Sequence, residues 1–98
     1  IGWLLSIEGA HALESDPANL VRLFDAGYRM IGLAHFFDND YAGSSAGIEQ
    51  GGLTALGQAT LAEMEARGIA VDLAHLAPAA IDDVLDRATK PVVVSHTG

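Results

Sequence analysis

The chain has 98 residues, half of them hydrophobic, and its 5 basic and 13 acidic residues give a formal net charge of -8. That excess of negative charge argues against a nucleic-acid backbone or an anionic membrane as a partner. The absence of cysteine excludes a disulfide framework and a thiolate metal site. No apolar run approaches the roughly 20 residues that span a bilayer. The compartment stays open, with the cytoplasm favoured if the source is bacterial.

Short apolar runs alternate with amphipathic stretches along the whole chain. Asp16 and Pro17 are residue types that begin helices, Thr54 is another N-cap type, and Gly27 and Gly68 are types that end them. Strands are expected at residues 3–7, 30–33, 69–73 and 92–94, and helices between Asp16 and Gly27, between Thr54 and Gly68, and from Pro78 onward. The expected inner face of the last helix carries Ile81, Val84 and Leu85.

This order predicts an α/β fold with about four parallel strands and three intervening helices. It fits a partial (β/α)8 TIM-like barrel, and it also fits a small open sheet. A complete barrel needs roughly 250 residues, and half a barrel leaves strand edges and an interior unfilled. We therefore expect a longer functional protein, although a self-contained α/β module remains an alternative.

Ionisable side chains follow the expected strands within two residues. They are Glu8, His35, His75 and His96. In parallel β/α folds the C-terminal strand ends form one face, where active sites are built. Carboxylate and imidazole are usual ligands of catalytic zinc, and a carboxylate can bridge two metal ions. The spacing alone indicates a metal or acid–base site without naming a reaction, and each histidine alone is more often a hydrogen-bonded packing residue.

Other polar residues have less specific patterns. Asp72 lies inside an expected strand, where a buried carboxyl group needs a partner; it could orient a ligand histidine or form a salt bridge. The loop after His35 is long for a connection, which suggests a substrate-lining role or an ordinary surface loop. His11 is expected to be a loop residue or a residue that supports a ligand side chain, without a direct ligand role. A solvent-facing helix surface is expected for Asp82, Asp83 and Asp86.

Five short motifs occur in order along the chain. They are residues 6–9 (SIEG), 31–35 (IGLAH), 51–54 (GGLT, with Gly57), 71–75 (VDLAH) and 91–96 (PVVVSH). The series resembles the membrane dipeptidase (renal dipeptidase) family of zinc metallopeptidases over essentially the whole chain. The resemblance implies a (β/α)8 barrel that holds two zinc ions at its C-terminal face. The implied activity is hydrolysis of dipeptides by a metal-bridging hydroxide.

The resemblance also implies roles for individual residues. Glu8 would bridge both metal ions, His75 and His96 would bind the second ion, and His35 would contact the substrate. Glu8 and His35 are thus the candidate catalytic residues, and Glu8, His75 and His96 the candidate metal ligands. The family's His-x-Asp pair, a further aspartate and a substrate-binding arginine have no counterpart in these residues. Residues 1–98 are therefore expected to be an internal fragment of a single metallohydrolase barrel domain, inactive in isolation.

Two other functions remain open at this point. A binuclear-metal barrel hydrolase could act on another amide or on a lactone, and a barrel relative could have lost catalysis. The expected partner is a dipeptide substrate, without nucleic acid, and a homodimer of the full-length protein stays open. The loop after His35 reads Phe-Phe-Asp-Asn, which differs from the Asn-rich form more familiar in the family and leaves the preferred dipeptide undefined.

Overall fold

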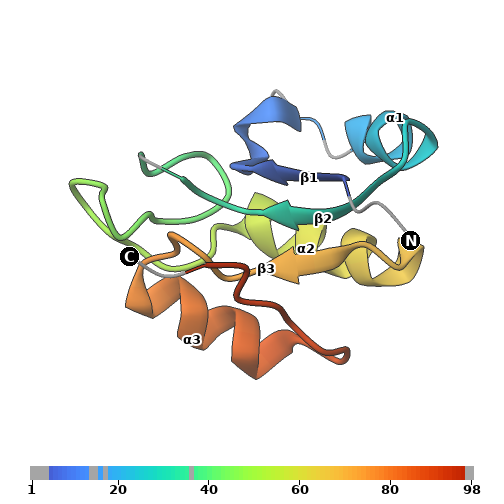
Figure 1. Ribbon diagram of the computed structural model, residues 1–98. Helices are drawn as coiled ribbons and strands as arrows, with labels where there is room; N and C mark the ends of the chain where they lie inside the picture. Colours follow the sequence, from blue (N-terminus) through green and yellow to red (C-terminus); the bar gives the residue numbers. More distant parts are fainter. Residues whose placement is uncertain (1–4, 14–15, 17, 36, 97–98) are drawn as a thin grey trace.

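A computed structural model describes residues 5–13, 16, 18–35 and 37–96, with backbone alone for residues 11 and 12. Within this part the strands form a parallel sheet in the order β1-β2-β3 (Figure 1). The strands are β1 (Leu5–Glu8), β2 (Tyr28–Gly32) and β3 (Ala70–Asp72). The parallel α/β class predicted from the sequence is therefore confirmed, with three strands in place of four.

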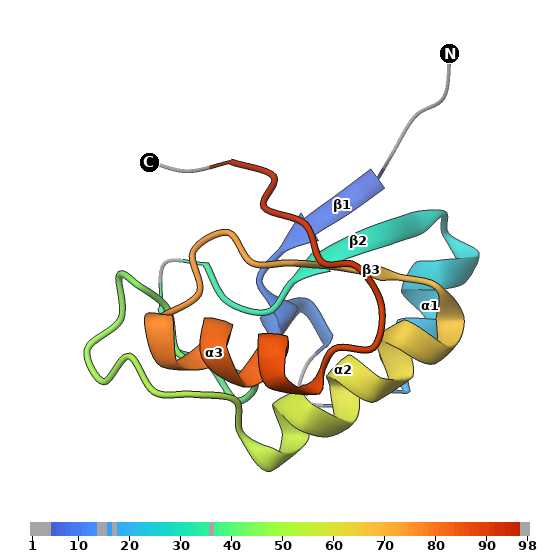
Figure 2. The same ribbon diagram turned by 90° about the horizontal axis from the view of Figure 1, so that it is seen from below.

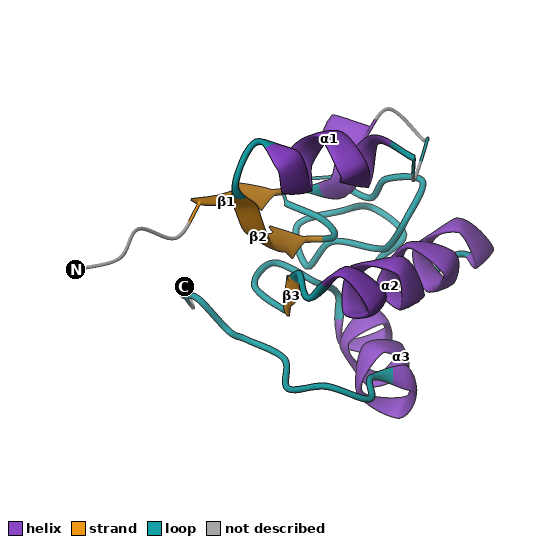
Figure 3. Cartoon of the chain, turned by 90° about the vertical axis from the view of Figure 1, so that its right-hand side faces the viewer, coloured by secondary structure: helices purple, strands orange, loops and turns teal. Residues whose placement is uncertain are grey.

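Helical elements connect the strands. They are the 3-10 helix η1 (Ala10–Leu13) and the α-helices α1 (Asn19–Asp25), α2 (Ala55–Arg67) and α3 (Pro78–Arg87). The α-helices lie on one side of the sheet, and the C-terminal segment runs beside β3 at the edge of the sheet (Figures 2 and 3). Among the described residues no helix combines the length and apolar character needed to cross a membrane.

The core lies between the sheet and the helices. Each strand and helix that faces it contributes apolar side chains: Leu20, Ile31, Leu61, Met64, Val71 and Val84 are buried. Ile81 packs partly buried against this core. Leu85 was expected on the inner face of its helix, but it is 55% exposed. That prediction is wrong because the buried stripe of α3 runs through Ala80 and Val84, and Leu85 follows one position later, about 100° round the helix.

Local signals explain both ends of α2. The Thr54 side chain accepts a hydrogen bond from the Gly57 N–H at 3.0 Å, and Gly68 ends α2 with a left-handed φ of 75°. The predicted cap at Asp16 is wrong: the α1 N-cap is Ala18, and Asp16 Oδ1 accepts the Ala18 N–H at 3.0 Å. Asp16 thus forms a turn before the helix; Pro17 lies outside the described residues.

The fourth strand, expected at residues 92–94, is reduced to a single parallel bridge between Asp72 and Val93. The Val93 N–H donates to the Val71 carbonyl at 2.9 Å, and the Leu73 N–H donates to the Val93 carbonyl at 2.7 Å. The ladder then stops because the next amide, that of Ser95, donates to the Asp72 side chain at 3.1 Å. A side-chain acceptor has replaced a backbone acceptor at the end of β3.

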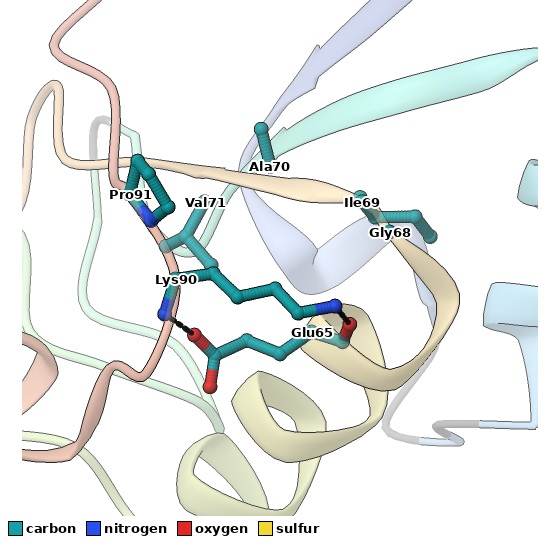
Figure 4. Close-up of a pocket in the computed structure, with 7 residues that line it drawn as sticks. All are labelled: Glu65, Gly68, Ile69, Ala70, Val71, Lys90 and Pro91. Carbon is teal, nitrogen blue, oxygen red and sulfur yellow. Dashed lines mark hydrogen bonds between the residues drawn. The ribbon is translucent and has the colours of Figure 1, made fainter.

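At the opposite end of β3, Glu65 anchors the segment that leads to Val93 (Figure 4). Its carboxylate accepts the Thr89 and Lys90 N–H groups at 2.9 Å each, and Lys90 Nζ donates to the Glu65 carbonyl at 2.6 Å. These bonds border a hollow of about 200 Å³. The segment that carries Ser95 and His96 is thus fixed at its start by Glu65 and at its end by Asp72.

Candidate metal centre

The strand ends bring the predicted site residues together. Glu8 is the last residue of β1, and its Oε2 lies 2.6 Å from His35 Nε2 and 3.8 Å from His75 Nε2. Glu8 Oε1 lies 3.9 Å from His96 Nε2. The sequence-based expectation that these residues share one face is therefore met. Their individual roles stay predictions.

The histidine rings meet edge to face and direct nitrogens toward one another. His35 and His75 have ring centroids 4.5 Å apart at 73°, and His75 and His96 have centroids 4.7 Å apart at 64°. His75 Nε2 lies 2.7 Å from His96 Nε2. Metal–ligand bonds of about 2.0–2.2 Å in a tetrahedral site separate the ligand atoms by roughly 3.3 Å. The donors fit such an ion after small movements.

Glu8, His35 and His75 form a group whose ligand atoms all lie within 4.8 Å of one another. His35 was expected to contact substrate, yet it lies nearer to Glu8 than either histidine predicted as a ligand. The side chains of Glu8 and His96 are close to half exposed, at 45% and 44%. The cluster is therefore open to water and to a small ligand on one side.

His75 is held in an unusual backbone conformation. Its φ is 66°, in the left-handed region that costs energy for a residue with a Cβ atom. The Ser45 N–H donates to the His75 carbonyl at 2.8 Å, and the Ala77 N–H donates to the Gly43 carbonyl at 2.9 Å. The loop after His35 thus fixes the backbone of His75. Sequence reasoning missed this contact, because it joins backbone groups that are distant in the chain and do not depend on the side-chain types.

The same loop is tied to His35. The Ser44 hydroxyl donates to the His35 carbonyl, and Asn39 Nδ2 donates to the Leu33 carbonyl at 2.6 Å. Residues 41–44 are buried. The loop therefore packs against His35 and His75 and supports them. Neither of the two interpretations of its sequence, a substrate-lining loop or an ordinary surface loop, included this role. The substrate-lining role stays a prediction.

Asp38 organises the outer part of this loop. Its carboxylate accepts the Ser44 N–H at 2.8 Å and the Glu49 N–H at 2.9 Å. These hydrogen bonds, led by that of Ser44, hold the pKa of Asp38 below its ordinary value. An ionised carboxylate is thus the form that the loop requires.

Asp72 is buried, at 4% exposure, and hydrogen bonds supply the partners that its carboxyl group needs. It accepts the Ala74 N–H at 3.0 Å, the Ser95 N–H at 3.1 Å and the Ser95 hydroxyl. Burial by itself raises the pKa of Asp72, but the hydrogen bonds, the Ser95 hydroxyl foremost, outweigh it and hold the pKa below its ordinary value. Asp72 reaches the cluster through Ser95, on the segment that carries His96.

The remaining predictions concern His11 and the aspartates of α3. The side chain of His11 lies outside the described residues. Asp83 was expected on the solvent-facing surface of its helix, but it is half-buried and accepts the Leu53 N–H at 2.9 Å. That prediction is wrong for Asp83 because the end of the long loop packs against α3 there. Asp82 and Asp86 are exposed as expected.

Comparison with known proteins finds relatives that are described as dipeptidases. A family model described as "Membrane dipeptidase (Peptidase family M19)" matches residues 1–98. The chain is 37% identical to "Dipeptidase aclJ" of Aspergillus oryzae and 35% identical to "Uncharacterized dipeptidase C965.12" of Schizosaccharomyces pombe, in each case over 99% of this chain and 24% of the relative. It thus spans about a quarter of the length of these curated relatives.

Solved structures are similar as well. The probable dipeptidase PvdM from Pseudomonas aeruginosa matches with a TM-score of 0.90 and 27% identity, over 95% of this chain and 25% of that one. A metallo peptidase from Rhodobacter sphaeroides, liganded with a phosphinate mimic of the dipeptide L-Ala-D-Ala, matches with a TM-score of 0.86 and 27% identity, over 95% of this chain and 28% of that one.

Proposed function

Because the chain belongs to the membrane dipeptidase family, we propose that it supplies part of the active site of a zinc-dependent dipeptidase. The observation that carries the proposal is the convergence of Glu8, His35, His75 and His96 at the C-terminal ends of parallel strands. The dipeptidase names of the curated relatives support the same activity.

The proposed fold of the full-length protein is a (β/α)8 barrel with this chain as an internal part of a single domain. Two features favour it. The strands are parallel and the α-helices lie on one side of them, as in the wall of a barrel (Figure 3). The solved relatives are also about four times longer than the matched region, since that region covers 25–28% of them.

The proposed cofactor is zinc, with two ions in the complete site. Glu8 would bind both ions, and His75 and His96 would bind one of them. Their nitrogen and oxygen donors match the preference of catalytic zinc, and one structural relative is itself described as a metallo peptidase. Bound zinc would polarise the peptide carbonyl group and lower the pKa of an attacking water molecule.

His35 is proposed to bind the substrate. Its Nε2 lies 2.6 Å from Glu8, so a modest ring rotation would redirect its N–H toward a peptide oxygen beside that carboxylate. A donor placed there stabilises the negative charge that develops on the oxygen during hydrolysis. The hydrogen bond from the Ser44 hydroxyl to the His35 carbonyl would hold the backbone in place during such a rotation.

The proposed substrates are dipeptides, in line with the dipeptide mimic bound by the Rhodobacter sphaeroides relative. A second candidate is another small amide, since one structural relative from Pseudomonas aeruginosa is described as an amidohydrolase at 26% identity and a TM-score of 0.85. A panel of free dipeptides, N- and C-blocked dipeptides and lactones separates these candidates. Preference for free dipeptides is expected.

The central test is Glu8→Gln in the full-length protein. We expect loss of metal-dependent dipeptide hydrolysis, because the neutral amide cannot bridge two cations. Glu63→Gln is the matched control: Glu63 is an exposed helix residue paired with Arg67 at 3.1 Å, and its loss is expected to leave turnover unchanged. Wild-type turnover by the Glu8→Gln variant would rule out the proposed activity.

A further inference from the structure

A chain of hydrogen bonds leads from a buried carboxylate to one of the histidines of the cluster. Asp72 Oδ2 accepts a hydrogen bond from the hydroxyl of Ser95, and Ser95 Oγ lies 2.9 Å from His96 Nδ1. The other ring nitrogen of His96, Nε2, faces His75 Nε2 at 2.7 Å and Glu8 Oε1 at 3.9 Å. One edge of the ring is therefore bound to the protein, and the other faces the proposed metal.

The chemistry of the groups fixes the direction of these bonds. The ionised carboxylate of Asp72 has no proton to donate, so the single hydroxyl hydrogen of Ser95 must point toward it. The oxygen of Ser95 can then only accept from His96, and this requires a proton on Nδ1. A neutral ring with a proton on Nδ1 has its lone pair on Nε2.

We propose that Asp72 and Ser95 are positioning residues that hold His96 in the Nδ1–H tautomer and thereby present its Nε2 lone pair to the metal ion. This inference rests on the proposed function. Partners of this kind orient the ring and restrict a ligand histidine to one tautomer, and their loss lowers metal affinity about 10–100-fold in known sites. Here the carboxylate acts through a serine and does not touch the ring.

The backbone contacts of Asp72 make the inference testable at the carboxylate. Asp72 Oδ1 accepts two amide hydrogens, those of Ala74 and Ser95, at 3.0 and 3.1 Å. In an Asp72→Asn variant the amide oxygen must keep this position, which directs the NH2 group toward Ser95 Oγ. Ser95 then accepts from the amide and donates to His96 Nδ1. The variant should therefore move the His96 proton to Nε2.

A substitution at Ser95 tests the inference with less disturbance of the backbone than one at Asp72. Ser95→Ala removes the hydroxyl but keeps the backbone N–H that binds Asp72, so the end of the sheet is retained. Ser95 is exposed, which leaves room for the additional methyl group of Ser95→Thr. The threonine variant preserves the hydroxyl and is expected to behave like the wild type.

The experiment uses the full-length protein and two measurements. Zinc affinity is measured by competition with a chromophoric chelator, and the His96 tautomer is read from ¹⁵N chemical shifts of histidine rings in the zinc-depleted protein. We expect Ser95→Ala and Asp72→Asn to lose about 10–100-fold in affinity for one zinc ion and to lose the Nδ1–H tautomer. Ser95→Thr should restore both properties.

Unchanged affinity or an unchanged tautomer in the Ser95→Ala variant would overturn the inference. If Asp72→Asn unfolds, which circular dichroism would show, Ser95→Ala and Ser95→Thr still decide it. A wild-type protein that binds zinc but hydrolyses no dipeptide would contradict the proposed function alone, because neither the tautomer nor the affinity measurement depends on turnover.

Discussion

His75 Nε2 and His96 Nε2 lie 2.7 Å apart, although 21 positions separate the two residues in the chain. Nitrogens this close favour one shared ion over two separate ions, since ions in binuclear sites are about 3.5–4 Å apart. The pair is therefore expected to bind one shared ion.

The first prediction concerns metal content. His75→Ala and His96→Ala should each lower bound zinc by about one equivalent per chain, because each leaves the shared ion short of a nitrogen ligand. The double variant should lose no more than either single variant. Elemental analysis after gel filtration provides the measurement, and a loss of two equivalents in the double variant would show that the histidines bind different ions.

The second prediction separates a substrate role of His35 from a ligand role. His35→Leu should leave the zinc content at the wild-type value, whereas kcat/KM for dipeptides should fall by about 10²–10³, because leucine cannot donate a hydrogen bond to a developing oxyanion. Zinc analysis and steady-state kinetics on the same preparation check both parts. Loss of a zinc equivalent would instead identify His35 as a metal ligand, a role that its 2.6 Å contact with Glu8 also allows.

The third prediction concerns pH and the loop held by Asp38. Hydrogen bonds from the Ser44 and Glu49 amides lower the pKa of Asp38 in the folded state, below the value of about 3.9 in an unfolded chain. A group with a lowered folded pKa stabilises the fold at pH values above its unfolded pKa, and this contribution disappears as the pH falls through the folded pKa. The loop should therefore loosen in acid and stay ordered at neutral pH.

Hydrogen exchange of the Ser44 and Glu49 amides provides the measurement. The Asp38→Asn variant should show faster exchange than the wild type at neutral pH, and the difference should vanish in acid, where the wild-type carboxyl group is protonated. Asp86→Asn, on the exposed side of α3, is the control and should match the wild type throughout. Equal exchange in Asp38→Asn and wild type at neutral pH would disprove the role of Asp38.

The boundaries of α2 illustrate what sequence signals can predict. Thr54 and Gly68 define the two ends of α2 through contacts within a few residues of each. The residue types at these two positions were therefore enough to predict where the helix begins and ends. The convergence of Glu8 with the histidines was equally predictable, because parallel strands end on one face whatever their side chains. The fold class and the composition of the cluster follow from such local and periodic patterns.

The end of β3 illustrates what sequence signals miss. Asp72 lies in an apolar run that resembles a strand continuing to Leu73, yet its side chain captures the Ser95 amide and ends the ladder. This competition involves residues 23 positions apart. The left-handed backbone of His75 likewise depends on an amide of the distant loop. Both features decide how the ligand histidines are held, and neither has a local signature.

The last prediction concerns Gly57, in the first turn of α2. Replacing glycine by alanine inside a helix normally stabilises it by about 1 kcal/mol. Here a Cβ atom on Gly57 would lie 2.0 Å from the Tyr41 carbonyl oxygen and 3.2 Å from the Leu53 side chain. The oxygen is part of the backbone and also accepts the Thr54 N–H at 2.9 Å, so it cannot move away freely. Gly57→Ala should therefore destabilise the full-length protein by about 1–3 kcal/mol.

Gly51→Ala is the matched control, because a Cβ atom there meets nothing within 4 Å and its φ is not in the left-handed region. Chemical denaturation of both variants, followed by circular dichroism, gives the comparison, and Gly51→Ala should stay within about 0.5 kcal/mol of the wild type. A Gly57→Ala variant more stable than the wild type would mean that the Tyr41 segment is free to shift. Since this segment leads into the loop that holds His75, the same variant should also bind zinc more weakly.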